Sequence, residues 1–265
     1  MGIQAPQRFD SGEHYEPYVG HWSRRVARDF VAGLGVPPGS RWLEVGCGTG
    51  ALTAAILEQG GGAQVVACEP SEGFLAYARR TIPDPRASFV HREVAAVPIP
   101  AVPFDACASG LVLNFIPDPR AALAAIRERV RPGGTIAAYV WDYAEGMRMM
   151  RIFWDAATML DRAARAYDEA TRFPMCRPQP LRALWSEAGC REVSTRRLAV
   201  VTRFHDFDEF WRPFLGGQGP APSYFASLDA ESRAALTAEV HRRIPIDGDA
   251  SVTLEAVAWE VRGTC

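Results

Sequence analysis

A glycine-rich segment in the first third of the chain has the residue types that bind a nucleotide-like cofactor. It reads Glu44-Val45-Gly46-Cys47-Gly48-Thr49-Gly50, and it lies between an expected strand over 41–46 and an expected helix over 50–59. Glycines at this spacing let the backbone turn tightly and approach a ligand without a clash at Cβ. Glu69 ends the next expected strand, over 64–69, where a ribose-binding carboxylate is expected. The pattern therefore predicts a site for a ligand that carries a ribose.

The same segment also fits the dinucleotide-binding pattern Gly-x-Gly-x-x-Ala, with Ala51 in its last position. NAD is therefore a competing cofactor. A dinucleotide-binding fold usually starts at its first strand, whereas here an expected helix over 21–34 and an aromatic segment come before that strand. This arrangement favours another nucleotide cofactor.

The elements that must position these residues alternate between strand and helix as far as Trp141. Beyond those named above, helices are expected over 71–82 and 118–130, and strands over 105–109 and 135–141. Such alternation is typical of βαβ units and a parallel sheet. We therefore expect an α/β fold with a Rossmann-like, doubly wound, seven-stranded sheet. The sheet should be mostly parallel, with an antiparallel last strand and helical lid insertions.

The pattern is less regular after Trp141. It indicates one long helix over 146–170, strands over 191–202 and 251–262, and helices over 178–188 and 229–243. We expect a single domain with three parts: an N-terminal helical segment and cofactor-binding core over 1–145, a lid or substrate insertion over 146–177, and a completion of the sheet over 178–265 with a second insertion at 204–249. Residues 216–224 are rich in glycine and proline, which indicates either a lid loop or a plain connector.

Five segments within residues 40–141 together resemble the class I S-adenosylmethionine-dependent methyltransferases. LEVGCGTG, CEPSEGFLAYAR and HREVAAVPIPAVPFD are similar to their first three motifs, and GLVLNFIPDP and RVRPGGTIAAYVW to the fourth and fifth. The likeness is greatest to small-molecule enzymes of the ubiquinone and menaquinone C-methyltransferase group. In place of the Arg-Asn pair of that group, this chain has Asn114-Phe115.

The resemblance implies S-adenosylmethionine as the cofactor and a role for each motif. Gly46, Gly48 and Gly50 would line its methionine and ribose parts, and Glu69 would accept hydrogen bonds from both ribose hydroxyls. The remaining implied cofactor residues are Tyr15, Trp22, Arg24, Glu44, Cys47, Pro70, Ser71, Glu93, Val94, Ser109, Gly110 and Leu111. Arg25 is an alternative to Arg24 as partner of the cofactor carboxylate, and a core Trp22 beside surface arginines is the structural alternative to both.

Candidates for substrate binding and catalysis come from the strand ends, the N-terminal segment and the insertions, because ligands of open parallel sheets bind beyond the carboxyl ends of the strands. Methyl transfer from a sulfonium mainly requires alignment, and a base is needed only where the nucleophile carries a proton. The catalytic candidates are His14, Tyr18 and Asp142, and the substrate candidates are Asn114, Trp141, Trp154, Phe173, His205 and Trp211. The structural alternatives are a turn cap for Asp142, core packing for Trp154 and a helix start for His205.

Composition excludes several other chemistries. All 29 Lys+Arg residues are arginine, so the chain has neither a Schiff-base lysine nor a phosphate-loop lysine. A net charge of −2 lacks the excess of basic residues that is typical of nucleic-acid-binding domains. No apolar run is long enough for a membrane span. The six cysteines form no CxxC pair, so no metal site is expected.

We therefore expect a bacterial, cytoplasmic enzyme, monomeric or homodimeric, that methylates O, C or N of a small, apolar or aromatic molecule. The alternatives are a biosynthetic enzyme of this fold that transfers no methyl group, such as a cyclase, and an NAD-dependent oxidoreductase.

Overall fold

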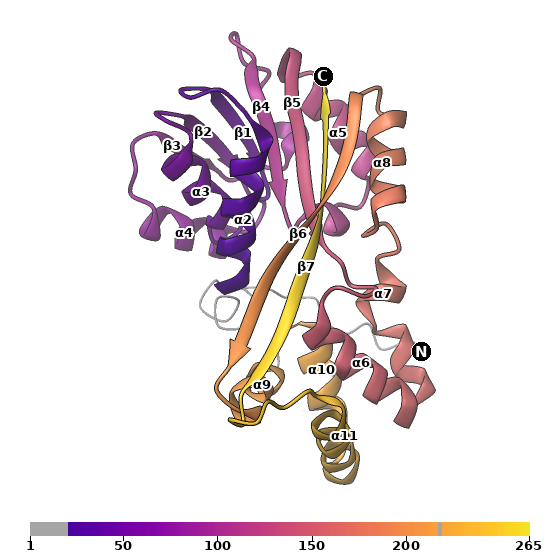
Figure 1. Ribbon diagram of the computed structural model, residues 1–265. Helices are drawn as coiled ribbons and strands as arrows, with labels where there is room; N and C mark the ends of the chain where they lie inside the picture. The colour runs from indigo at the N-terminus through magenta and orange to yellow at the C-terminus, as the bar shows by residue number, and fades with distance from the viewer. Residues whose placement is uncertain (1–20, 217–218) are drawn as a thin grey trace.

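The computed structural model describes residues 21–216 and 219–265, which form a sheet flanked by helices (Figure 1). The sheet has seven strands in the order β3-β2-β1-β4-β5-β7-β6. The first five strands of this order pair in parallel, whereas β7 is antiparallel to both β5 and β6. The predicted Rossmann-like sheet, with its antiparallel last strand, is therefore confirmed. The strand order reverses between β1 and β4, which is where ligands bind in doubly wound sheets.

Most strands lie where the pattern predicts them. Their bounds are Arg41–Val45 (β1), Gln64–Cys68 (β2), Ala87–Val90 (β3), Phe104–Gly110 (β4), Val130–Trp141 (β5), Arg191–Phe204 (β6) and Val252–Thr264 (β7). The bounds of β3 are not evident from the sequence, because this edge strand has four residues and none of them is fully buried. β5 starts at Val130 rather than at 135, since the strand continues through the Pro-Gly-Gly segment.

Helices cover both faces of the sheet. They are α2 (His21–Leu34), α3 (Ala51–Gln59), α4 (Glu72–Thr81), α5 (Pro119–Arg127) and α8 (Pro178–Glu187). On α2, Val26 and Phe30 are fully buried at helical spacing, so one face of this helix belongs to the core. Side-chain caps define two of the starts: Ser71 accepts from the Phe74 amide at the start of α4, and Asp118 accepts from the Ala121 amide at the start of α5.

The long helix predicted over 146–170 is interrupted, and this prediction is wrong. The segment contains α6 (Arg148–Leu160), a 3-10 turn η4 (Arg162–Ala166) and the short helix α7 (Glu169–Arg172). Asp161 is extended and its side chain accepts from the Ala163 amide, while Asp168 accepts from the Ala170 amide. Aspartate side chains that bind nearby backbone amides compete with the helical hydrogen bonds, which accounts for both breaks.

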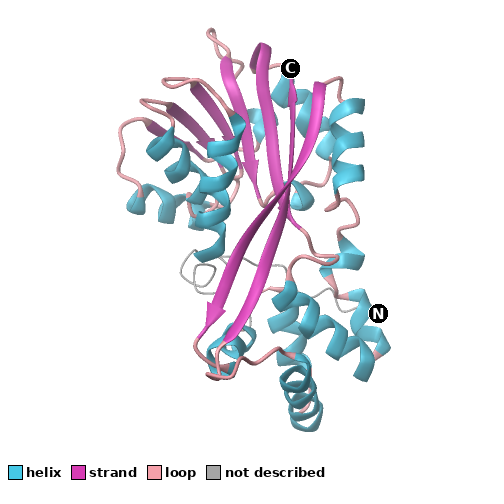
Figure 2. Cartoon of the chain, viewed as in Figure 1, coloured by secondary structure: helices cyan, strands magenta, loops and turns pink. Residues whose placement is uncertain are grey.

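The segment between β6 and β7 folds into helices at the far end of these two strands, which extend well past the rest of the sheet (Figure 2). Its elements are α9 (Phe207–Trp211), η5 (Arg212–Leu215), α10 (Pro220–Ser227) and α11 (Ala230–Arg243). Residues 220–224 are thus the first turns of a helix and not a loop, because Pro220 suits the first turn. Phe153 of α6 stacks on Phe214 at 4.8 Å between ring centroids, so the two insertions share one aromatic cluster.

Among the helices of residues 21–216 and 219–265, none combines the length and apolarity that crossing a membrane requires.

Candidate cofactor and acceptor site

The loop after β1 depends on its glycines for its shape. Gly46, Gly48 and Gly50 all have positive φ, at 71°, 52° and 89°. A Cβ atom at Gly46 would lie 2.5 Å from Cγ1 of Val112, whereas one at Gly48 would meet no atom within 4 Å. The backbone at Gly48 therefore borders open space, and a ligand can approach the loop there.

Glu69 follows β2 and is held by two backbone amides. Its Oε2 accepts from the Gly48 amide at 3.0 Å, and its Oε1 accepts from the Ser71 amide at 2.9 Å. The side chain is buried, and burial raises the pKa of this carboxyl while the two amide hydrogen bonds oppose the rise. Each carboxylate oxygen can accept more than one hydrogen bond, so Glu69 retains capacity for two ligand hydroxyls.

Glu44, near the end of β1, is a second buried acid at this loop. Thr53 Oγ1 donates to its Oε2 at 2.5 Å, and its Oε1 has no partner among the described residues. Burial raises the pKa of Glu44 to about 7, against the lowering effect of the Thr53 hydrogen bond. A carboxyl in this setting exchanges its proton near neutral pH.

A cavity of about 640 Å³ runs from the glycine loop to the insertions, and its size is typical of small-molecule sites. The predicted cofactor residues that line it are Glu44, Gly46, Cys47, Gly48, Glu69, Pro70, Glu93, Val94, Gly110 and Leu111. Glu93 and Val94 belong to the turn before and within η2 (Val94–Ala96). The structure thus brings together most of the residues that the motifs single out.

Other predicted cofactor residues support the cavity wall without lining it. Gly50 precedes α3, Ser71 caps α4, and Ser109 Oγ donates to the Val45 carbonyl at 3.0 Å. Trp22 is buried against Phe204, with ring centroids 6.0 Å apart, which is the core placement named as its alternative.

Arg24 is exposed on α2, and Arg25 donates to the Val201 carbonyl of β6. Tyr15, His14 and Tyr18 lie outside the described residues. From α2 it is Ser23 that lines the cavity.

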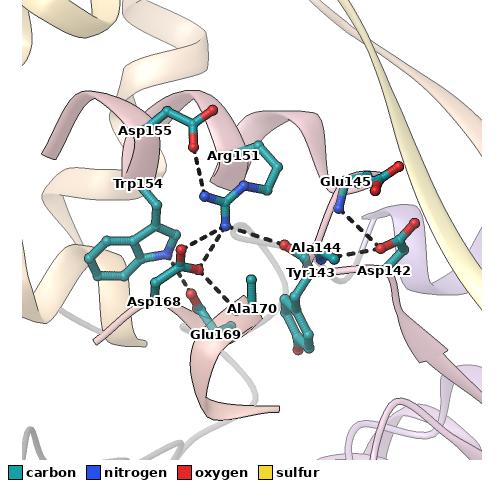
Figure 3. Close-up of polar contacts among 10 residues, drawn as sticks. All are labelled: Asp142, Tyr143, Ala144, Glu145, Arg151, Trp154, Asp155, Asp168, Glu169 and Ala170. Carbon is teal, nitrogen blue, oxygen red and sulfur yellow. Dashed lines mark hydrogen bonds and ion pairs between the residues drawn. The ribbon is translucent and has the colours of Figure 1, made fainter. Parts of the chain in front are cut away.

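The acceptor side of the cavity is formed by aromatic and apolar side chains from the insertions and the strand ends. Of the predicted substrate residues, Trp141 and Phe173 line it. Asn114, in η3 (Leu113–Phe115), is buried, and neither polar atom of its amide has a partner within the described residues. Asp142 Oδ1 accepts from the Ala144 and Glu145 amides, both at 3.1 Å, so this side chain stabilises the turn after β5 (Figure 3).

Three further substrate candidates do not line the cavity. Trp154 is fully buried, and Trp211 is buried in the aromatic cluster around Phe153. His205 is exposed and contacts Asp206, the residue that caps α9, which is the helix-start placement named as its alternative. The two tryptophans are buried because the apolar faces of the helices in the insertions pack against one another. His205 lies just before the start of α9.

Sequence reasoning does not single out several lining residues. On the acceptor side these are Phe115, Tyr143, Glu169 and Pro220. Phe115 belongs to the fourth motif, next to the predicted substrate residue Asn114, so the sequence contained a signal that it could line the site. Glu169 gives no such signal, since an acid within a helical pattern is usually exposed to solvent.

Fold and site together define the chain as an α/β protein built to bind a nucleoside-type cofactor at the switch point of its sheet. Residues 43–138 match a family model described as a methyltransferase domain. This segment is therefore similar to methyltransferase domains, as its motifs predict. Among residues 21–216 and 219–265, no three His, Cys, Asp or Glu side chains are grouped so as to hold a metal ion.

Similar proteins include two curated enzymes and one solved structure. The chain is 30% identical over 113 residues to trans-aconitate 2-methyltransferase of Azoarcus sp. (43% of this chain, 44% of that protein). It is 36% identical over 99 residues to demethylmenaquinone methyltransferase of Clavibacter sepedonicus (37% and 40%). The aligned part thus spans less than half of either relative.

Phosphoethanolamine N-methyltransferase 2 of Haemonchus contortus, in complex with S-adenosyl-L-methionine, shares the fold with a TM-score of 0.56 at 14% identity. That comparison covers 95% of this chain and 56% of the other.

Proposed function

We propose that the protein binds S-adenosylmethionine and transfers its methyl group to O, C or N of a small, apolar or aromatic molecule. The observation that carries this proposal is that one cavity joins the glycine loop and Glu69 to an aromatic half formed by the insertions. The match of residues 43–138 to a methyltransferase domain supports it.

The residues at the glycine loop fit this cofactor. Open space beside Gly48 admits a ligand to the backbone, and Glu69 would accept hydrogen bonds from its ribose hydroxyls. Glu93 and Val94 would contact its adenine, and Gly110 and Leu111 would form the floor of its site. The sulfonium of the bound cofactor supplies an activated methyl group, so the protein mainly has to align the acceptor and exclude water.

The aromatic half of the cavity would bind the methyl acceptor. Phe115 and Phe173 meet edge to face with centroids 5.2 Å apart, and Tyr143 lies against Phe173 at 5.7 Å. These rings offer flat apolar surface, which suits an aromatic or otherwise apolar acceptor. Met150 and Pro220 come from the two insertions, so both insertions would act as parts of one lid over the acceptor.

The chain's charge supports a small acceptor rather than nucleic acid, because a net charge of −2 provides no attraction for phosphates. We also infer a cytoplasmic, bacterial protein that works as a monomer or a homodimer.

Calorimetry with S-adenosylhomocysteine and with NAD tests the proposal. We expect the sulfur nucleotide to bind and NAD to show no heat of binding at the same concentrations. Tight binding of NAD alone would favour a dinucleotide-dependent oxidoreductase. Binding of S-adenosylhomocysteine without any turnover of labelled S-adenosylmethionine across phenols, acids, amines and quinones would favour a non-methylating enzyme such as a cyclase.

A further inference from the structure

Glu169 is a buried acid on the acceptor side of the cavity. It is the first residue of α7, it is among the residues that line the cavity, and it is 3% exposed. Trp154 Nε1 of α6 donates to its Oε2 at 2.5 Å (Figure 3). The described partner of this carboxyl is therefore a neutral indole. Burying a carboxyl with a neutral hydrogen-bond donor as its partner costs folding free energy, which points to a functional reason for keeping this residue.

The arginine beside Glu169 is committed to other acids. Arg151 Nη1 lies 2.7 and 2.9 Å from the two oxygens of Asp168, and Arg151 Nη2 lies 2.7 Å from Asp155 Oδ1. Arg151 Nη1 also donates to the Tyr143 carbonyl at 3.3 Å, so it connects α6, α7 and the turn after β5. This network fixes the start of α7 and leaves the Glu169 carboxyl directed to the Trp154 indole (Figure 3), at a residue that lines the cavity.

The surroundings of Glu169 also set its protonation. Burial raises its pKa to about 7, and the nearby Asp168 charge adds to the rise. Its own backbone amide, the Trp154 indole and Arg172 oppose it. A carboxyl of this kind exchanges protons at neutral pH, which is the requirement for a general base at working pH.

We propose that Glu169 is a catalytic residue that contacts the acceptor and takes the proton from its nucleophilic oxygen or nitrogen. This assignment rests on the proposed function. It defines the acceptor as an aromatic or apolar molecule with a hydroxyl or amino group, whose body lies between Phe115, Tyr143 and Phe173.

The acceptor heteroatom forms a bond to the methyl carbon, and the carbon–sulfur bond breaks with its electron pair retained on sulfur, which becomes a neutral thioether. The O–H or N–H bond of the acceptor breaks, and its proton moves to a carboxylate oxygen of Glu169.

The substitution Glu169→Gln tests this role, because glutamine keeps the size and still offers Trp154 an amide oxygen, but cannot take the proton. The matched control is Glu145→Gln, at an exposed position in the turn after β5. Turnover is measured with labelled S-adenosylmethionine and a panel of phenols and anilines from pH 5.5 to 8.5, and S-adenosylhomocysteine affinity by calorimetry.

For Glu169→Gln we expect kcat to fall by about 100-fold or more and its rise with pH through about 7 to disappear. The affinity for S-adenosylhomocysteine should stay within about twofold of the wild-type value, as should every parameter of Glu145→Gln. A higher wild-type kcat for phenols than for anilines would identify oxygen as the acceptor atom. A higher kcat for anilines would identify nitrogen.

Three results would contradict the role of Glu169. The first is a wild-type pH profile and kcat in Glu169→Gln, and the second is a wild-type kcat that does not vary over this pH range. The third is methylation of no member of the panel by wild-type protein that binds S-adenosylhomocysteine. If Glu169→Gln does not fold, Glu169→Asp should keep the rise with pH at a lower kcat. Failure of the wild type to bind S-adenosylhomocysteine would instead contradict the proposed function.

Discussion

The Oε2 atom of Glu69 accepts a hydrogen bond from the Gly48 amide at 3.0 Å, which joins the end of β2 to the loop after β1. The register of the two strands explains this contact, since Val45 pairs with Cys68 and both strands end at the same edge of the sheet. The acid and the loop therefore reach the cavity in a fixed relative position, which lowers the entropy that the protein must lose when a ligand binds between them.

Replacing Glu69 by alanine should weaken binding of S-adenosylhomocysteine by about 10- to 100-fold, because charge-assisted hydrogen bonds to the ribose are lost. Calorimetry measures the change. Glu72→Ala is the control, since Glu72 lies nearby on α4 with a side chain that is 63% exposed. Equal affinities of wild type and Glu69→Ala would exclude the ribose role.

Substitution by alanine should lower the free energy of unfolding more at Gly46 than at Gly48. Both glycines have positive φ, so each substitution strains the backbone by about 1–2 kcal/mol. Only the Cβ at Gly46 would also clash with Val112, which adds about 1–3 kcal/mol. Urea denaturation should therefore show a lower free energy of unfolding for Gly46→Ala than for Gly48→Ala. The opposite order would mean that the loop does not have this conformation.

The free energy of unfolding should depend on pH through the titration of Glu44. Its pKa is raised from 4.5 to about 7 in the folded protein, so between these values the folded state binds more protons than the unfolded state. The free energy of unfolding should therefore fall as pH increases from 4.5 to 7. Glu44→Gln removes this contribution, and its denaturation midpoints should fall less over that range. Glu58→Gln, at an exposed residue of α3, should keep the wild-type slope.

The Trp154 indole should influence the titration of Glu169. Its N–H donates to the carboxylate and favours the charged form, so Trp154→Phe should raise the pKa of Glu169 further. The pH at which kcat reaches half its maximum should move upward with the proposed acceptors. Trp185→Phe is the control, because that indole donates to the Ile136 carbonyl in another part of the core. If the pH profile of kcat in Trp154→Phe were the same as in the wild type, the indole hydrogen bond would have no effect on the group whose titration controls kcat.

The cofactor half of the site could be predicted from the sequence because its determinants are local. Gly46, Gly48 and Glu69 follow directly from two strands, and parallel pairing of those strands brings their ends together without any further information. Gly110, at the end of β4, follows from its strand in the same way, whereas Glu93 is singled out by its motif alone.

The acceptor half could be predicted only in part, because it depends on how distant segments pack. Trp141 and Phe173, which the sequence singles out, line the cavity. Met150, Glu169 and Pro220 meet at one cavity although they come from three helices in two insertions. Trp154 and Trp211 have the residue type expected of a pocket, but the two insertions bury both against each other. Side-chain capping by Asp161 and Asp168 divides a continuous helical pattern, and this division places Glu169 at a helix start.

The last ladder of the sheet determines how the second insertion is attached. Phe204 at the end of β6 pairs directly with Val252 at the start of β7, so the segment between them leaves and re-enters the sheet at neighbouring residues. Such a segment can be exchanged for another of different length without a change in strand register. Replacing this segment should therefore change the acceptor of the proposed methyltransferase, while the glycine loop and Glu69 on the other side of the cavity stay unchanged.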